Sequence, residues 1–295
     1  MSEVLKNKID FSMVISVRNA NPNGDPNDGN RPREDYDGYG QISDVCIKRK
    51  IRNRLQDMGQ AILVQANDRR QDSHKSVQAR INACEELKAV ANGKKTNYDE
   101  YTKIACEKWA DVRAFGQVFA FSGNESSIGV RGPVSIRQGL SVSPINIVDM
   151  GITKSTNGSS TITNKDPEGN TKAPDTMGEK HFVDFALYVI HGSINCQLAE
   201  KTGFTEEDAE NIKEALLTLF ENDASAARPE GSMEVCRLYW HKHNGKTSKN
   251  TSAKVHRLLK VALKNEDERP TSVNDYDITM DTLEGLTTEE YNLMD

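Results

Sequence analysis

Two stretches of alternating residues constrain the fold more than any other feature of this 295-residue chain. Residues 9–18 read IDFSMVISVR, with an apolar side chain at every second position, and residues 181–194 read HFVDFALYVIHGSI. A period of two places apolar side chains on one face of a β-strand. We expect a half-buried strand at the first stretch, a second strand at the other, and a sheet that contains both.

The first strand runs into a loop of turn-forming residues, NANPNGDPNDGNRPR at 19–33. Asn, Gly, Pro and Asp favour tight turns, and such turns can present backbone N–H groups to an anion. A calcium loop is an alternative, because counting from Asn23 places oxygen ligands at Asp25, Asn27 and, twelfth, Glu34. Asp28, however, stands at the sixth position, where an EF-hand requires Gly. Plain turn structure is the third interpretation.

A basic helix is predicted to follow this loop, capped by Ser43 or Asp44. Its sequence, DVCIKRKIRNR at 44–54, contains five basic residues and one acidic residue. An apolar stripe facing the core places Lys48, Arg49 and Arg52 on one flank and leaves Lys50 and Arg54 on the other, since successive residues are 100° apart. Three cations on one flank can bind phosphates, although a solvated helix face has the same pattern. The stripe consists of Ile47, Ile51, Leu55 and Met58.

The rest of the chain alternates between predicted helices and strands, so the expected fold class is α+β. The polar segment 151–180, with Asn157-Gly158, predicts a β-hairpin. The order is compatible with a ferredoxin-like sheet that carries insertions at about 66–110 and 151–180. Helices are expected at 71–91, 98–112, 205–220 and through Leu263, and strands at 114–122, 128–137 and 233–240.

Charge is distributed unevenly along the chain. The net charge is −6, but residues 265–295 contain ten acidic residues and one basic residue, so the other 264 residues carry 37 basic against 34 acidic, a net of +3. A mildly basic body with a concentrated basic helix indicates an anionic partner. Five widely spaced cysteines suit a reducing cytosol and disfavour structural zinc, and no apolar run predicts a membrane span or a secretion signal.

The histidines point to no clear catalytic or metal site. His241 and His243 share a face at the end of a predicted strand, without a third ligand at a helpful spacing, and His181 and His191 flank a buried strand. Motifs for a P-loop, a nucleophilic serine or a dinucleotide fold are missing. We therefore expect a binding protein without cofactor or metal, and not an enzyme.

Five blocks of sequence carry a family resemblance. They are RNANPNGDPNDGNRPR after the first strand, DVCIKRKIRNRL in the basic helix, GVRGPVSIRQGLSVSPI at 129–145, TMGEKHFVDFALYVIHGSI at 176–194 and GSMEVCRLYW at 231–240. Together they resemble the CRISPR-associated backbone subunit of type I Cascade complexes, the Cas seven family, and its type I-C form most closely. The resemblance extends to about residue 265.

The resemblance implies a molecule shaped like a right hand, with an RRM-like (ferredoxin-like) palm, a helical finger insertion and a β-hairpin thumb. Its expected parts are the first palm segment 1–65, the finger 66–110, the middle palm strands 111–150, the thumb 151–180, the last palm segment 181–264 and an acidic C-terminal tail 265–295.

The resemblance also implies a function. Copies would stack into a helical filament along CRISPR RNA, hold its phosphate backbone without reading sequence, and present the spacer to target DNA. The other partners would be further Cascade subunits, and the setting antiviral defence in the cytoplasm, with no membrane. The implied RNA contacts are Arg18, Asn19 and Asn21 in the loop, Lys48, Arg49 and Arg52 on the basic helix, Arg137 and Gln138 at a strand end, and Met177 as a wedge beside a base.

Two other functions stay open from sequence. One is an RRM-like endonuclease that processes CRISPR RNA, which would cleave a repeat hairpin at one site. The other is a free-standing, sequence-specific RNA-binding module. The second is less favoured, because such modules stack bases on sheet aromatics and the central strands offer no such Phe/Tyr cluster.

Overall fold

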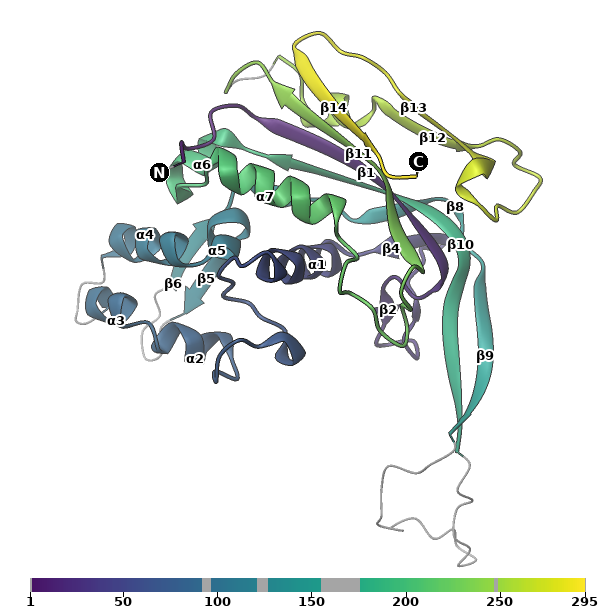
Figure 1. Cartoon of the computed structure of the whole chain (residues 1–295), viewed down its shortest axis with the longest axis horizontal. Helices are drawn as coiled ribbons and strands as arrows, with labels where there is room; N and C mark the ends of the chain where they lie inside the picture. The colour runs from purple at the N-terminus through teal and green to yellow at the C-terminus, as the bar shows by residue number, and fades with distance from the viewer. Residues whose placement is uncertain (1, 92–96, 121–126, 155–175, 247–248, 295) are drawn as a thin grey trace, which may run out of the picture.

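A large antiparallel sheet organises the molecule, here described from a computed structural model of residues 2–91, 97–120, 127–154, 176–246 and 249–294. Its strand order is β14-β11-β1-β10-β8-β4, and β7 and β9 also pair with β10 (Figure 1). The strands are β1 (Ile9–Ala20), β4 (Tyr39–Ile42), β7 (Val134–Ile136), β8 (Gly139–Pro144), β9 (Ile147–Lys154), β10 (Thr176–Ile194), β11 (Met233–His243) and β14 (Leu286–Asn292).

Strand β1 lies at the centre and is buried on both faces. Every residue from Ile9 to Val17 is buried, so the expectation of a half-buried strand is wrong. The polar positions lie under a second layer and pair inside it: Asp10 Oδ2 is 2.7 Å from His243 Nε2 and 3.1 Å from Lys8 Nζ. A buried charge of this kind is tolerated only when it is paired.

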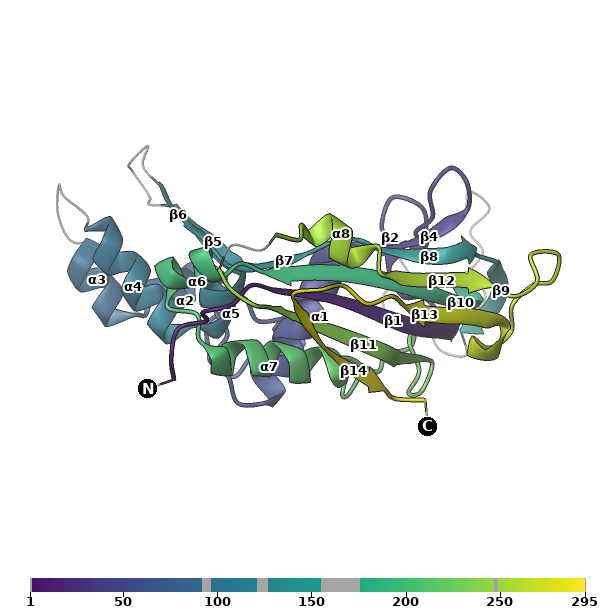
Figure 2. The same cartoon turned by 90° about the horizontal axis from the view of Figure 1, so that it is seen from above.

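Helices α1 (Asp44–Asp57) and α7 (Glu206–Leu217) cover one face of the sheet (Figure 2). The predicted stripe is confirmed, because Ile47, Ile51 and Leu55 are buried in the main core. Ser43 caps α1, its Oγ accepting a hydrogen bond from the Cys46 N–H at 3.3 Å. Thr205 opens α7 with a full capping box, as its position in the sequence predicts.

The opposite face is covered by α8 (Ser252–His256) and a ribbon of β12 (Leu259–Leu263) and β13 (Tyr276–Met280). The helix expected through Leu263 is therefore wrong beyond α8. The acidic segment 265–295, expected as a separate C-terminal tail, supplies β13 and β14, and β14 pairs with β11 at the edge of the sheet. Apolar residues such as Tyr276 anchor this segment in spite of its charge.

A separate helical region builds its own small core. The helices expected at 71–91 and 98–112 are each broken, at Ala83 and at Trp109, whose backbone is extended. The region also includes a two-stranded ribbon of β5 and β6. The short helix α6, which follows β10, was not predicted from the sequence. The elements are α2 (Val77–Asn82), α3 (Glu85–Ala91), α4 (Tyr98–Lys108), α5 (Ala110–Phe115), β5 (Gly116–Ala120), β6 (Ser127–Arg131) and α6 (Cys196–Thr202).

Strand β9 pairs with the first half of β10, from Ile147 opposite Val183 to Lys154 opposite Thr176. This β9–β10 ribbon projects away from the sheet (Figure 1). The predicted turn at Asn157-Gly158 lies outside the described residues. In the described part of the chain, no helix combines the length and apolar character needed to cross a bilayer.

Candidate nucleic-acid interface

The loop after β1 folds into a short ribbon of β2 (Gly24–Asp25) and β3 (Arg31–Pro32). Asn19, Gly29 and Asn30 have φ values of +50°, +54° and +62°. This left-handed region is open to Gly and tolerated by Asn, and closed to most other residues. The backbone path thus favours Asn or Gly at these three positions.

The loop is tied to the beginning of α1. The side-chain oxygen of Asn23 accepts hydrogen bonds from the Ser43 backbone N–H and from Ser43 Oγ, both at 2.8 Å. The Cys46 thiol donates to the Pro22 carbonyl at 3.7 Å. These contacts hold the loop against the positive end of the helix dipole, an environment that favours anions.

The tip of the loop is tied to the base of the β9–β10 ribbon. Asp149 Oδ1 is 2.7 Å from Arg31 Nη1 and 2.7 Å from His181 Nδ1. These two hydrogen bonds lower the pKa of Asp149. The end of β1, the beginning of α1 and the base of the ribbon therefore meet at one place, which we call the junction.

Arg18, Asn19 and Asn21 lie at the end of β1 and the beginning of the loop, and their surroundings differ. Arg18 is exposed, donates to the Thr271 carbonyl at 2.7 Å and lies over the Phe185 ring. Asn19 is exposed. Asn21 is buried, and its Nδ2 donates to the Asn30 carbonyl at 2.6 Å, so its observed contact shapes the loop.

The cations of α1 separate into the two predicted flanks, but most are engaged within the fold. Lys48 pairs with Asp44 one turn earlier at 2.9 Å. Arg49 donates to the Val64 carbonyl at 2.7 Å, and burial lowers its pKa. Arg52 Nε donates to the buried Asp111 carboxylate at 3.0 Å. On the other flank, Lys50 pairs with Asp223 and Arg54 with Glu221.

Asp111 explains why Arg52 is held so firmly. The Asp111 carboxylate is 1% exposed and also accepts the backbone N–H groups of Leu63 and Val64, at 2.8 and 3.1 Å. Arg52 thus joins α1 to the helical region. Its guanidinium lies over the Phe115 ring, with 4.9 Å between Arg52 Cζ and the centroid.

Arg137 and Gln138 are exposed but lie apart from the junction. The backbone N–H of Arg137 donates to the His191 carbonyl at 2.8 Å, whereas the junction lies near Val183 on the same strand. Eight residues of strand span about 26 Å. Met177 lies in the opposite direction, paired with Thr153 in the ribbon.

A family model described as CRISPR-associated protein Cas7 matches residues 7–281. The chain belongs to this family. A "CRISPR-associated protein Cas7" of Haloferax volcanii is 25% identical over 246 residues, covering 79% of this chain and 69% of the relative. A chain of a solved "CRISPR RNA-guided surveillance complex, pre-nicking" matches 89% of this chain and 84% of its own, with a TM-score of 0.50 and 14% identity. That similarity supports a shared mixed α+β fold.

Reasoning from sequence missed three residues of the junction of this Cas7-family chain: Arg31, Asp149 and His181. Arg31 stands near the end of the 19–33 loop, where the sequence gives no sign of its partner. Asp149 and His181 pair directly across the β9–β10 ribbon. The acidic and imidazole side chains are visible in the sequence, but only the register of the two strands brings them together.

The other titratable residues do not extend the junction. Within the described ranges, no group of three or more His, Cys, Asp and Glu side chains has the arrangement of a metal site. Asp25, a residue of the calcium interpretation, instead accepts the backbone N–H of Asn27 at 3.0 Å and lies 3.4 Å from Arg33 Nη2.

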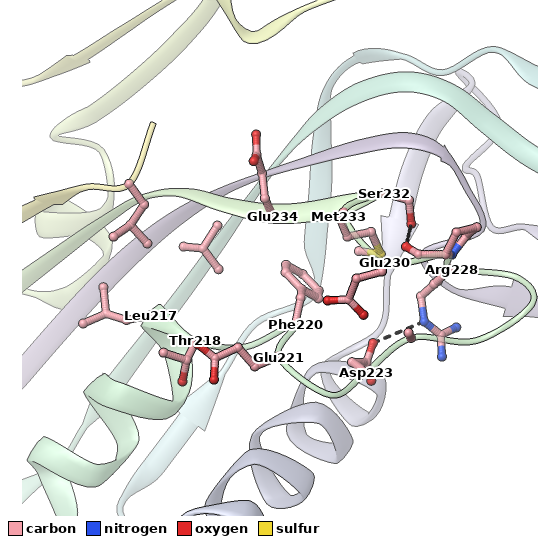
Figure 3. Close-up of a pocket in the computed structure, with 15 residues that line it drawn as sticks. Leu217, Thr218, Phe220, Glu221, Asp223, Arg228, Glu230, Ser232, Met233 and Glu234 are labelled. Atoms are coloured by element: carbon pink, nitrogen blue, oxygen red, sulfur yellow. Dashed lines mark hydrogen bonds and ion pairs between the residues drawn. The ribbon is translucent and has the colours of Figure 1, made fainter. Parts of the chain in front are cut away.

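A cavity of about 260 Å³ lies between the end of α7 and the beginning of β11 (Figure 3). Arg228 donates to Asp223 within it at 3.3 Å. Because Glu221, Glu230 and Glu234 also line it, a phosphate would meet mostly negative charge. The cavity is therefore poorly suited to binding a phosphate.

Proposed function

We propose that this chain is the guide-RNA-binding backbone subunit of a CRISPR surveillance complex of the type I-C form. It holds the phosphate backbone without reading sequence and presents the spacer for pairing with target DNA in antiviral defence. The observation that carries the proposal is the junction, where a loop with exposed polar groups, a helix N-terminus and a projecting ribbon converge.

The topology supports an RRM-like palm. Read along the chain, β1, α1, β8, β10, α7 and β11 follow a βαββαβ order, and β11, β1, β10 and β8 are adjacent in the sheet in that order. This is the split βαβ arrangement of ferredoxin-like folds. The helical region then corresponds to a finger and the β9–β10 ribbon to a thumb.

Copies of the chain assemble head to tail along the guide. A heterologous interface that does not close produces such a filament. RNA favours assembly because each added copy releases counterions and is tethered beside its neighbour. Other subunits of the complex cap the filament.

The proposed RNA contacts are Arg18, Asn19, Lys48 and Arg49 with Arg31, while Asn21 and Arg52 position the loop and the helix. Arg31 is 32% exposed and shares Asp149 with His181. Phosphates compete with Asp149 for this guanidinium, because Arg binds carboxylate and phosphate with the same fork of N–H donors. Met177 remains the proposed wedge beside a base.

The test compares the double variant Arg31→Ala/Lys48→Ala with Lys88→Ala/Lys103→Ala, which removes two exposed lysines from the helical region. Binding of unrelated RNAs is measured over a salt series. The junction variant should bind all RNAs more weakly to the same extent. The slope of log affinity against log salt concentration should fall by about 0.7 per lost phosphate contact. Loss confined to one sequence, or equal effects in both variants, would contradict the proposal.

RNA cleavage is the second candidate, favoured by the His181–Asp149 pair at the junction. The His181 side chain is only 10% exposed and its Nδ1 is already bonded, which disfavours proton transfer to a bound RNA. We therefore propose binding without catalysis. Cleavage of a repeat hairpin that disappears in His181→Ala would establish the enzyme instead.

A further inference from the structure

A second basic stretch of the chain lies outside the junction. Residues 235–265 contain eight Lys and Arg residues and no Asp or Glu. Five of the eight have partners in the fold: Arg237 with Glu290, Lys242 with Glu206, Lys246 with Glu200, Lys260 with Asp281, and Lys264 with the Asn274 carbonyl. Most of these cations are thus already paired with a carboxylate or a carbonyl of the fold.

The other three cations surround α8. Lys249, Lys254 and Arg257 are exposed, and among the described residues none of them forms an ion pair. Lys254 Nζ is 3.2 Å from Asn250 Oδ1, a neutral partner that leaves its charge available. Such cations contrast with Lys48, Lys50, Arg52 and Arg54 of α1, which pair with carboxylates of the fold.

Arg137 joins this group from a different element. The His256 ring of α8 stacks on the His191 ring of β10, with 4.7 Å between centroids. The His191 carbonyl accepts the Arg137 backbone N–H, and the charge of Arg137 contributes to lowering the pKa of both histidines. Arg137 thus lies beside the stacked pair to which α8 contributes His256, and Arg257 directly follows His256 in the chain. We call Arg137, Gln138, Lys249, Lys254 and Arg257 the α8 surface.

A hollow of about 550 Å³ lies beside α8. Lys249 and Lys254 line it together with the amides of Asn244 and Asn250, and Glu284 is the one carboxylate in its lining within the described residues. Lysines and amide side chains are the groups that bind phosphate and sugar oxygens.

We propose that the α8 surface binds the phosphate backbone of a second single strand of nucleic acid, distinct from the guide at the junction. The surface lies on the sheet face opposite α1 and α7 (Figure 2). An acidic protein fits less well, because protein interfaces depend on buried apolar anchors and Val255, the apolar residue of α8, is already buried in the fold. The proposal extends the proposed function but does not require the junction to bind RNA.

The test uses two probes and three variants. The probes are fluorescent dT30 and a guide RNA. The variants are Lys249→Ala/Lys254→Ala/Arg257→Ala, the junction variant Arg31→Ala/Lys48→Ala, and a matched control, Lys88→Ala/Lys103→Ala/Lys201→Ala, which removes the same charge elsewhere. Because all the substituted α8 side chains are exposed, far-UV circular dichroism should show an intact fold.

The α8 variant should bind dT30 at least tenfold more weakly at 0.1 M salt, with a salt slope lower by about 2 for three lost phosphate contacts. It should keep its guide affinity, and photo-crosslinked dT30 should map to residues 249–257 in the wild type and in the junction variant. Unchanged dT30 binding by the α8 variant would overturn the proposal. Displacement of dT30 by polyglutamate at equal charge would assign the surface to acidic protein instead. Failure of the proposed function would show separately, as unchanged guide binding by the junction variant.

Discussion

Two histidines, one buried and one partly buried, should make the stability of this protein depend on pH above the range where carboxylates titrate. His191 and His241 lie on the sheet face that α8 covers, beside Asp10, His243 and His256. Burial lowers the pKa of His191 to about 3 and that of His241 to about 4. Neighbouring His256 and Arg137 reinforce the shift of His191, whereas Asp10 opposes that of His241.

The direction of the pH dependence follows from whether the folded or the unfolded state binds more protons. An unfolded histidine has a pKa of about 6.5, so below that pH the unfolded chain takes up protons that the folded chain excludes. The stabilisation is complete above pH 7 and is lost progressively as the pH falls from 6.5 toward the folded pKa values of about 3 and 4. At pH 5 each histidine costs about 2 kcal/mol, about 4 kcal/mol together, and the slope approaches 2.7 kcal/mol per pH unit. His256, whose pKa burial also lowers, adds to the same trend.

Guanidinium unfolding at pH 7, 6 and 5, at constant ionic strength, measures this loss. His191→Gln should flatten the pH dependence by about one proton, or about 1.4 kcal/mol per pH unit. His74→Gln, in the helical region, provides the control and should retain the full slope. A midpoint that does not move between pH 7 and 5, or an equal slope in all variants, would refute the reasoning.

Two further predictions concern α1 and the ribbon. Arg52→Ala should lower the free energy of unfolding by about 3–5 kcal/mol, because it leaves the buried Asp111 charge unpaired. Lys48→Ala should lower it by less than about 1 kcal/mol. Similar denaturation midpoints for the two variants would contradict this. Replacing residues 155–175 by a short Gly-Ser link should preserve far-UV circular dichroism, because Lys154 and Thr176 are already paired, while chemical probing of bound guide should lose its periodic base reactivity; an unfolded product would show that the segment belongs to the core.

The sequence predicted those elements whose own residues fix their structure. The stripe at Ile47, Ile51 and Leu55 required only that one face of a helix be apolar, and Thr205 with Asp208 was sufficient to begin α7. The positive φ values at Asn19 and Asn30 are likewise local properties. In each case the physical cause lies within a few residues of its effect.

The rest depended on partners that are distant along the chain. Arg52 and Asp111 are 59 residues apart, and Lys50 and Asp223 are 173 apart. The burial of Asp10 depends on α8, which follows it by more than 230 residues. Charge counting set the acidic segment 265–295 apart as a tail, but its few apolar side chains and the open edge of β11 were enough to place it in the fold.

These partners change what a run of basic residues means. A Lys or Arg that already faces a carboxylate must give up that contact before it binds a phosphate. Its net contribution to RNA affinity is therefore small even where the side chain lies close to the RNA. Arg52 belongs to this class, since the carboxylate of its partner Asp111 is buried. Arg31 is an intermediate case, since its partner Asp149 is exposed and can be solvated when released. Lys249, Lys254 and Arg257 have no such competitor among the described residues. Affinity for polyanions should therefore follow the unpaired cations of the fold and not the density of basic residues in the sequence.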